Sequence, residues 1–462
     1  MNERLRRFLA PYASLKLTVV LLALATFLVF AGTVAQIDKG IWTVVDEYFR
    51  CAFAWVEFRI FFPRAWDIPG GIWFPGGWLI GGLLLLNVIS AHLLRFKSKA
   101  TGSRLLGGSL VIAAGAVLVG MIIAGVFDQD IAATEEAAFW RVLLRLAKGG
   151  GAALVLMIGC MMVFGRRAGI VLLHSGIILM LISEFVTGTF AVEGRMRIEA
   201  GESLNYVEHM RSFELAITDR SQADADKVSV IPFARLLKGP VSGDDLPVDV
   251  EVVLSMRTSR IMEGAPMGGT NPATTGVGLI AYASEKQEAA GTDTNQTIDI
   301  PAAYVRLSSP GGGPDLGTYL VSPWFVDTVY EQQPLQIGDN RYDIELRFER
   351  SYKPYSIELL EFRHDTYVGT DTPKNFSSRV RLFDGQKQVD REVTIWMNNP
   401  LRYAGETFYQ SSYEPGRDLT VLQVVRNRGW MIPYLSCMIV GAGMSLHMGG
   451  QLIGFLRRRR GS

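Results

Sequence analysis

The chain has 462 residues, of which 49% are hydrophobic and 20% are charged, and its mean hydropathy is +0.20. This composition is too apolar for an ordinary soluble protein and too polar for a bundle made only of membrane helices, so we expect several spans joined to one soluble domain. Lys and Arg total 46 against 45 Asp and Glu, which gives no indication of nucleic-acid binding. The three cysteines form no Cys-x-x-Cys pair, so no thiol-redox motif is predicted.

The N-terminal segment is basic and is followed by an apolar run over residues 17–35, about as long as a bilayer core is thick. A cleaved signal peptide is the alternative. The run is longer than a signal h-region, and residues 36–38 follow without a convincing cleavage site, so we expect a retained span. The loop 37–74 is rich in aromatic residues and is expected to lie at the membrane interface.

Further apolar runs predict membrane spans at about 78–94, 105–127, 150–164, 168–187 and 430–456. The run 150–164 is short for a span, and the charged segment before it, 128–148, is expected to form an amphipathic surface helix.

Basic residues dominate four segments, 1–14, 95–104, 165–167 and 457–462. If six spans alternate, these four segments share one side, which the positive-inside rule makes the cytoplasm. The polar region 189–428 then lies outside the cytoplasm. If the short fourth span were absent, this region would be cytoplasmic and the basic tail would be outside, which the rule disfavours.

Residues 189–428 show strand patterns, with alternating or β-branched runs such as 248–256 and 342–352 between Gly, Pro, Asn and Asp. We expect an antiparallel sandwich or barrel-like sheet, with a long loop over 263–296. No phosphate-binding loop, catalytic triad or metal-spaced His/Cys cluster is evident, so no catalytic residue is predicted.

The predicted fold class is therefore a membrane protein with an α-helical transmembrane bundle of about six spans and an extracytoplasmic mainly-β domain. Five spans belong to residues 1–188, the β-rich domain covers 189–428, and residues 429–462 form the last transmembrane helix with a basic cytoplasmic tail.

His174 lies about two turns inside the span 168–187 and is the main candidate site residue. An ionisable residue within a span is costly, which makes it a functional-site hypothesis by default. A neutral imidazole binds iron well, and the small neighbours Gly169, Ser175 and Gly176 would let a flat macrocycle or another helix approach. The alternative is an interhelical hydrogen bond with a purely structural role.

The other histidines are weaker candidates. His447 lies near the middle of the last span and could face His174 or a partner protein, although packing beside glycine neighbours is the simpler interpretation. His92 closes the second span and is expected to be hydrated at the interface. His209 and His364 are expected to have surface or strand-face roles in the soluble domain.

The segment 397–413, MNNPLRYAGETFYQSSY, resembles the signature of the ResB/CcsB family of cytochrome c biogenesis proteins, the System II type. Segments 14–16, 194–202 and 367–378 are also similar to that family. The signature residues singled out are Asn399, Pro400, Gly405, Tyr409 and Gln410. These residue types also suit a turn and a sheet core, so the signature identifies a family without proving a site.

The resemblance implies a non-catalytic half of a holocytochrome c synthase complex in the bacterial cytoplasmic membrane. Family members pair with a CcsA/ResC-type membrane protein, and together they carry haem b across the bilayer and attach it to apocytochrome c outside. His174 stands at the position implied to be an axial ligand of the haem iron, the other ligand coming from the partner. The family commonly has four spans in this half, so residues 104–165 look like an inserted hairpin of open function.

Two other functions are compatible with the sequence. A six-span transporter or ion path would use His174 and Glu184. A membrane-anchored scaffold would instead bind an extended peptide at an edge of its outer sheet.

Overall fold

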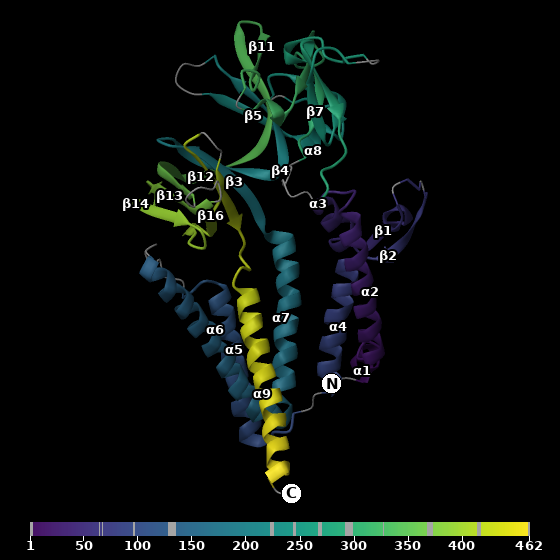
Figure 1. Ribbon diagram of the computed structural model, residues 1–462, viewed down its shortest axis with the longest axis vertical. Helices are drawn as coiled ribbons and strands as arrows, with labels where there is room; N and C mark the ends of the chain where they lie inside the picture. Colours follow the sequence, from purple (N-terminus) through teal and green to yellow (C-terminus); the bar gives the residue numbers. More distant parts are fainter. Residues whose placement is uncertain are drawn as a thin grey trace.

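The structure is a computed structural model, which describes residues 3–63, 65–66, 68–95, 98–127, 135–221, 226–243, 246–266, 270–291, 299–326, 328–366, 373–413 and 417–460. Several segments of the sequence analysis lie partly outside these residues, among them 128–148, 263–296 and 367–378. Figure 1 shows the long helices gathered at one end of the molecule and the strands at the other.

The N-terminal helices form one unit with a small β hairpin. Its elements are α1 (Glu3–Leu9), α2 (Leu15–Ala35), α3 (Ile41–Val44), β1 (Phe53–Glu57), β2 (Gly71–Pro75) and α4 (Gly77–Arg95). The aromatic loop expected at the interface thus contains a hairpin, in which the rings of Trp55 and Trp73 meet at 5.3 Å. The buried core of this N-terminal unit includes Tyr48 and joins the hairpin to α2 and α4.

The remaining long helices form a second unit. They are α5 (Gly102–Ile123), α6 (Glu135–Phe164), α7 (Ala168–Phe190) and α9 (Ile432–Arg460). Helices α5 and α6 pack closely through glycines, since a Cβ on Gly159 would lie 2.8 Å from the Ile112 side chain. This hairpin, which corresponds to the predicted insertion, shares a buried core with α7 and α9.

Among the described residues, five segments are long and apolar enough to cross a membrane, Leu15–Ala35, Gly77–Arg95, Gly102–Ile123, Val142–Phe190 and Ile432–Arg460. The fourth segment has 49 residues and contains most of α6 and all of α7, which a short 3-10 turn at Gly165–Arg167 separates. The predicted fold class, a helical membrane region with a large mainly-β domain, is confirmed.

Helix α6 differs from the sequence prediction. One continuous helix of 30 residues, Glu135–Phe164, replaces a surface helix ending at 148 and a separate short span starting at 150. The glycine run 149–151 lies where the prediction divided the helix. In the structure Gly149 packs against α9, because a Cβ there would lie 2.2 Å from the Met438 sulfur. The glycine therefore serves close helix packing and does not end the helix.

The β domain is dominated by one antiparallel sheet, which in the described residues has ten strands in the order β14-β13-β12-β4-β3-β17-β16-β15, with β5 paired to β4 and β11 to β12. These strands are β3 (Val192–Glu199), β4 (Ser203–Asp219), β5 (Lys227–Pro232), β11 (Gln333–Ile337), β12 (Asn340–Thr366), β13 (Pro373–Asp384), β14 (Val389–Trp396), β15 (Leu401–Tyr403), β16 (Glu406–Tyr413) and β17 (Leu419–Arg426).

This sheet curls on itself near the membrane helices, since Ser378 of β13 forms hydrogen bonds with Gln410 of β16 and Thr420 of β17, which lie towards the other end of the strand order. The resulting barrel-like wall encloses a core with fully buried Ile357, Phe408 and Leu422. Strand β3 follows α7 directly and β17 precedes α9, so this part of the domain lies over the membrane bundle (Figure 1).

A second, membrane-distal core joins the far halves of β4 and β12 to smaller elements. These are α8 (Phe233–Leu236), β6 (Asp249–Met256), β7 (Ser259–Glu263), β8 (Ala281–Glu285), β9 (Ala302–Ser308) and β10 (Asp315–Val321). The stretch 263–296, expected to be a long loop, contains β8, which pairs with β7. Within this strand Ala281 and Ala283 are buried.

Candidate functional site

Helix α7 packs tightly on α9 along a seam of glycines. A Cβ on Gly443 would lie 2.5 Å from the Leu173 backbone nitrogen, and one on Gly169 would lie 2.8 Å from the His447 nitrogen. Gly176, about two turns along α7 from Gly169, is equally close to Val440. The two small neighbours of His174, Gly169 and Gly176, therefore let another helix approach, which was one of the two predicted possibilities.

Helix α7 also contacts α4 through pairs of rings. Near the outer end Trp78 and Phe185 meet edge to face at 6.3 Å between ring centroids. Near the other end His92 and His174 meet at 4.8 Å, with their ring planes at 84°. The two helices are therefore antiparallel, and two half-buried imidazoles lie in contact at the same depth.

The tautomer of His92 follows from its hydrogen bond. Its Nδ1 lies 2.9 Å from the Val88 carbonyl oxygen of its own helix. Because a carbonyl only accepts, Nδ1 carries a proton and donates it, which leaves the lone pair of the neutral ring on Nε2. This bond to the backbone fixes the orientation of the His92 ring. His92, expected to be a hydrated interfacial residue, is instead part of the candidate site.

The other intramembrane candidates do not join this pair. His447 lies on α9, where its Nε2 accepts a hydrogen bond of 3.0 Å from the Gln451 amide. It packs beside Gly169, on the side of α7 that faces α9, and not against the His174 ring. Glu184 is exposed near the outer end of α7, so the structure does not bring it to His174 as an ion path requires.

The signature residues have structural roles at two tight turns. Asn398 has a positive φ of 65°, and the Asn399 nitrogen donates to the Trp396 carbonyl at 2.9 Å. Ala404 and Gly405, at φ 50° and 80°, connect β15 to β16 as a two-residue hairpin turn, which favours glycine. Pro400 stands between these turns, directly before β15, at the edge position that proline tolerates.

Gln410 of the signature belongs to a buried polar network. Its Oε1 accepts a hydrogen bond of 2.6 Å from Ser378, and its Nε2 donates to Thr420 at 3.0 Å. Ser378 and Thr420 are fully buried, so Gln410 links β13, β16 and β17 through groups that require partners. Its neighbour Tyr409 is half-buried. The signature therefore marks how the barrel-like wall is built.

A polar cavity that sequence reasoning missed lies in the membrane-proximal part of the β domain. It has a volume of about 110 Å³ and is lined by Val192, Gly194, Val207, His209, Ser351, Lys353, Glu406, Val424 and Arg426. Five strands contribute to it, and their positions in the sequence gave no sign that these residues meet.

The cavity wall contains a buried ion pair. Lys353 Nζ donates to Glu406 Oε1 at 2.7 Å, and the Tyr355 hydroxyl donates to the other carboxylate oxygen. Glu406 is only 6% exposed. Burial, together with the hydrogen bond to Glu406, raises the pKa of Tyr355, so this hydroxyl remains a donor at neutral pH.

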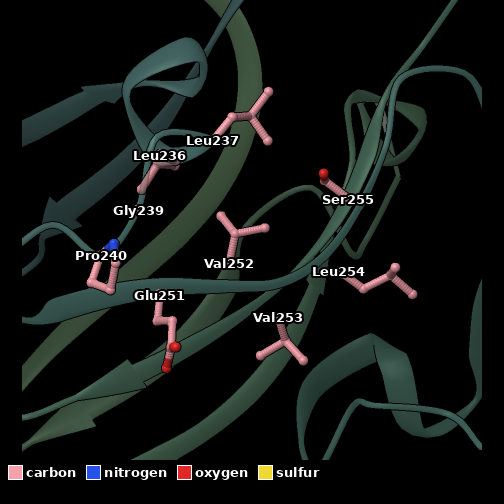
Figure 2. A pocket seen from close by; sticks show the side chains of 9 residues that line it. All are labelled: Leu236, Leu237, Gly239, Pro240, Glu251, Val252, Val253, Leu254 and Ser255. Atoms are coloured by element: carbon pink, nitrogen blue, oxygen red, sulfur yellow. The ribbon is translucent and has the colours of Figure 1, made fainter.

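Figure 2 shows a larger cavity of about 350 Å³ between β6 and the turn that follows α8. Strand β6 is at the edge of its three-stranded sheet, and Val253 and Leu254 beside the cavity are partly exposed. An apolar groove at a sheet edge is the geometry that the scaffold alternative requires.

In the described residues, no three His, Cys, Asp or Glu side chains gather as a metal site.

Comparison with known proteins relates the chain to one family. Residues 339–431 match the ResB-like family, and they run from β12 to the start of α9. Protein NrfI of Wolinella succinogenes is 30% identical over 114 residues, which are 25% of this chain and 13% of that protein. Cytochrome c biogenesis protein CcsB of a Picosynechococcus species is 39% identical over 69 residues, 15% of each chain. The chain therefore carries a ResB-like segment that includes the signature, and the predicted resemblance to the ResB/CcsB family is confirmed.

Proposed function

We propose that the chain is a cytochrome c maturation factor that handles haem within the membrane. The observation that supports this most directly is the contact between His92 and His174 inside the helical bundle of a chain with a ResB-like segment. Intramembrane imidazoles are costly and pair with other polar groups, and iron is a metal that they ligate well.

The spacing of the two rings supports a proposal in which they have different roles. A metal–imidazole bond is roughly 2 Å long, so two axial rings on one iron need centroids on the order of 6 Å apart. The centroids of His92 and His174 are 4.8 Å apart, and the rings are perpendicular. One ring therefore ligates the iron and the other supports it. We assign His174 as the ligand and His92, anchored to Val88, as the positioning residue.

The other axial ligand then comes from outside the pair. A CcsA/ResC-type membrane protein is the proposed source, and haem b is the proposed cargo of the two proteins. His447, whose Nε2 is engaged by Gln451, is not assigned this role.

The proposed sidedness follows from charge. With the basic ends of the spans in the cytoplasm of a bacterium, α7 and α9 carry the β domain on the opposite side of its cytoplasmic membrane. There the β domain would present apocytochrome c to the partner. No catalytic residue is assigned to this chain, so it would be the non-catalytic half of the haem-attaching complex.

Co-production tests this function. The chain, a CcsA/ResC-type partner and an apocytochrome with a Cys-x-x-Cys-His motif are expressed in a cell without its own maturation system, and covalent haem is measured on the cytochrome. We expect holocytochrome with the wild-type chain, a loss of at least tenfold with His174→Ala, and none without the chain. Equal holocytochrome with and without the chain would exclude the proposal.

A further inference from the structure

The polar cavity of the β domain lies close to the outer ends of the two helices that hold the domain. Val192, the first residue of β3, comes two residues after the end of α7 at Phe190. Arg426 ends β17, and Asn427 next to it donates a hydrogen bond of 3.3 Å to Thr187 in the last turn of α7. The cavity therefore lies beside the end of α7 at which the β domain begins.

The wall of the cavity offers donors to an anion. Lys353 Nζ donates to Glu406 at 2.7 Å and to Ser351 at 3.2 Å. These two bonds within the described residues use two of the three N–H groups of the ammonium. The charges of Lys353 and Glu406 cancel, and the exposed Arg426 adds a guanidinium to the wall. The three side chains together therefore carry one net positive charge. His209 adds a polar ring to the wall.

The size of the cavity restricts what can enter it. Its volume of about 110 Å³ has room for a few water molecules, each of which occupies roughly 30 Å³, or for one short carboxylate-bearing chain. A whole macrocycle does not fit. Gly194 in its wall lets β3 approach β4 closely, since a Cβ there would lie 2.5 Å from the Val207 side chain.

We infer that this cavity binds a carboxylate side chain of the porphyrin at the outer end of α7, through Arg426 and Lys353. The inference rests on the proposed haem function, since the porphyrin is the anionic amphiphile that this function brings to α7. A charged hydrogen bond to a carboxylate in a partly buried site is strong enough to hold one edge of the ring while the rest stays at the membrane surface.

Metal-free protoporphyrin IX is the probe that tests this inference, because it keeps the carboxylates and has no iron for a histidine to ligate. The full-length chain in lipid nanodiscs is titrated with it, and porphyrin fluorescence is followed against empty nanodiscs. We expect Arg426→Gln to weaken binding about tenfold. Arg428→Gln, an exposed arginine two residues away that does not line the cavity, is the matched control and should bind like the wild type.

Two further measurements separate the outcomes. The dimethyl ester of the porphyrin should bind the wild type about as weakly as protoporphyrin binds Arg426→Gln. The double variant Lys353→Met/Glu406→Gln removes the second cation without leaving a buried charge unpaired, and it should also weaken binding. Equal binding by the wild type, Arg426→Gln and the double variant, or by acid and ester, would overturn the inference.

His92→Ala/His174→Ala distinguishes this inference from the proposed function. We expect it to bind metal-free porphyrin like the wild type, while its haem lacks the Soret shift that imidazole ligation of the iron gives. If it lost the metal-free porphyrin as well, the ring would lie at the imidazole pair, and the cavity assignment would be wrong.

Discussion

The two faces of α7 are built differently. Towards α9, glycines on both helices let the backbones come together, and a Cβ on Gly443 would meet the backbone of Leu173 at 2.5 Å. Towards α4, large rings hold the helices apart, with Trp78 against Phe185 and His92 against His174. Lipid tails are as apolar as leucine, so close packing and polar contacts hold membrane helices together.

We expect the two sides of α7 to have different roles, the α9 side in stability and the α4 side in haem binding. The glycine seam fixes α7 on α9, and thereby fixes β3 and β17 above them. The ring contacts with α4 are fewer and join two helical units, each of which has its own buried core. We therefore expect substitutions on the α9 side to reduce the free energy of unfolding, and substitutions on the α4 side to reduce haem binding.

Gly443→Leu should have the largest effect on stability. Its new side chain would meet backbone atoms of Leu173 and Gly169, which cannot move away as a flexible side chain can. We expect a loss on the order of 3 kcal/mol, measured by unfolding of the purified chain in mixed micelles. Gly441→Leu is the control, because a Cβ at Gly441 meets open space and should cost little. Equal losses for the two variants would remove the distinction between the faces.

Asn87→Ala should have an intermediate effect, within the N-terminal unit. Asn87 is 3% exposed, its amide donates to the Tyr12 and Ser14 carbonyls at 2.5 and 3.1 Å, and its Oδ1 accepts from Thr18 at 2.8 Å. Loss of this network should cost about 2 kcal/mol in the same unfolding assay. Thr26→Val, at an exposed hydroxyl that bonds its own helix, should be close to neutral. A neutral Asn87→Ala would show that other contacts hold α2 to α4.

Phe185→Ala and His174→Ala should have the smallest effects on stability. Each variant removes one edge-to-face ring contact between α4 and α7, which is worth about 1 kcal/mol. Of the two, only His174→Ala should lose haem. If His174→Ala destabilised the chain as much as Gly443→Leu, the histidine pair would be a structural contact.

Much of the fold follows from local sequence. Apolar length placed α2, α4, α5, α7 and α9 within a few residues, and the turn residues around Asn399 and Gly405 indicated the hairpins of the signature. Helix α6 was divided wrongly because the role of a glycine run depends on which helix packs against it.

The sequence predicted one of the two histidines of the candidate site, His174, but not its contact with His92. The depth of His174 could be counted along its span, whereas its contact with His92 depends on α4 lying beside α7. The one available signal was that both histidines lie a few residues from basic segments at the ends of their spans, and therefore at similar depth. The cavity had no such signal, because Gly194, Lys353 and Glu406 meet only through the order of strands in the sheet.

The visible spectrum of the purified full-length chain, titrated with haem in nanodiscs, tests the central claim most directly. We predict a Soret band shifted from that of free haem in the wild type, its loss in His174→Ala, and weaker binding in His92→Ala that His92→Phe restores in part by keeping the ring contact. An unchanged Soret band in the His92→Ala/His174→Ala double variant would contradict the assignment of the imidazole pair to haem.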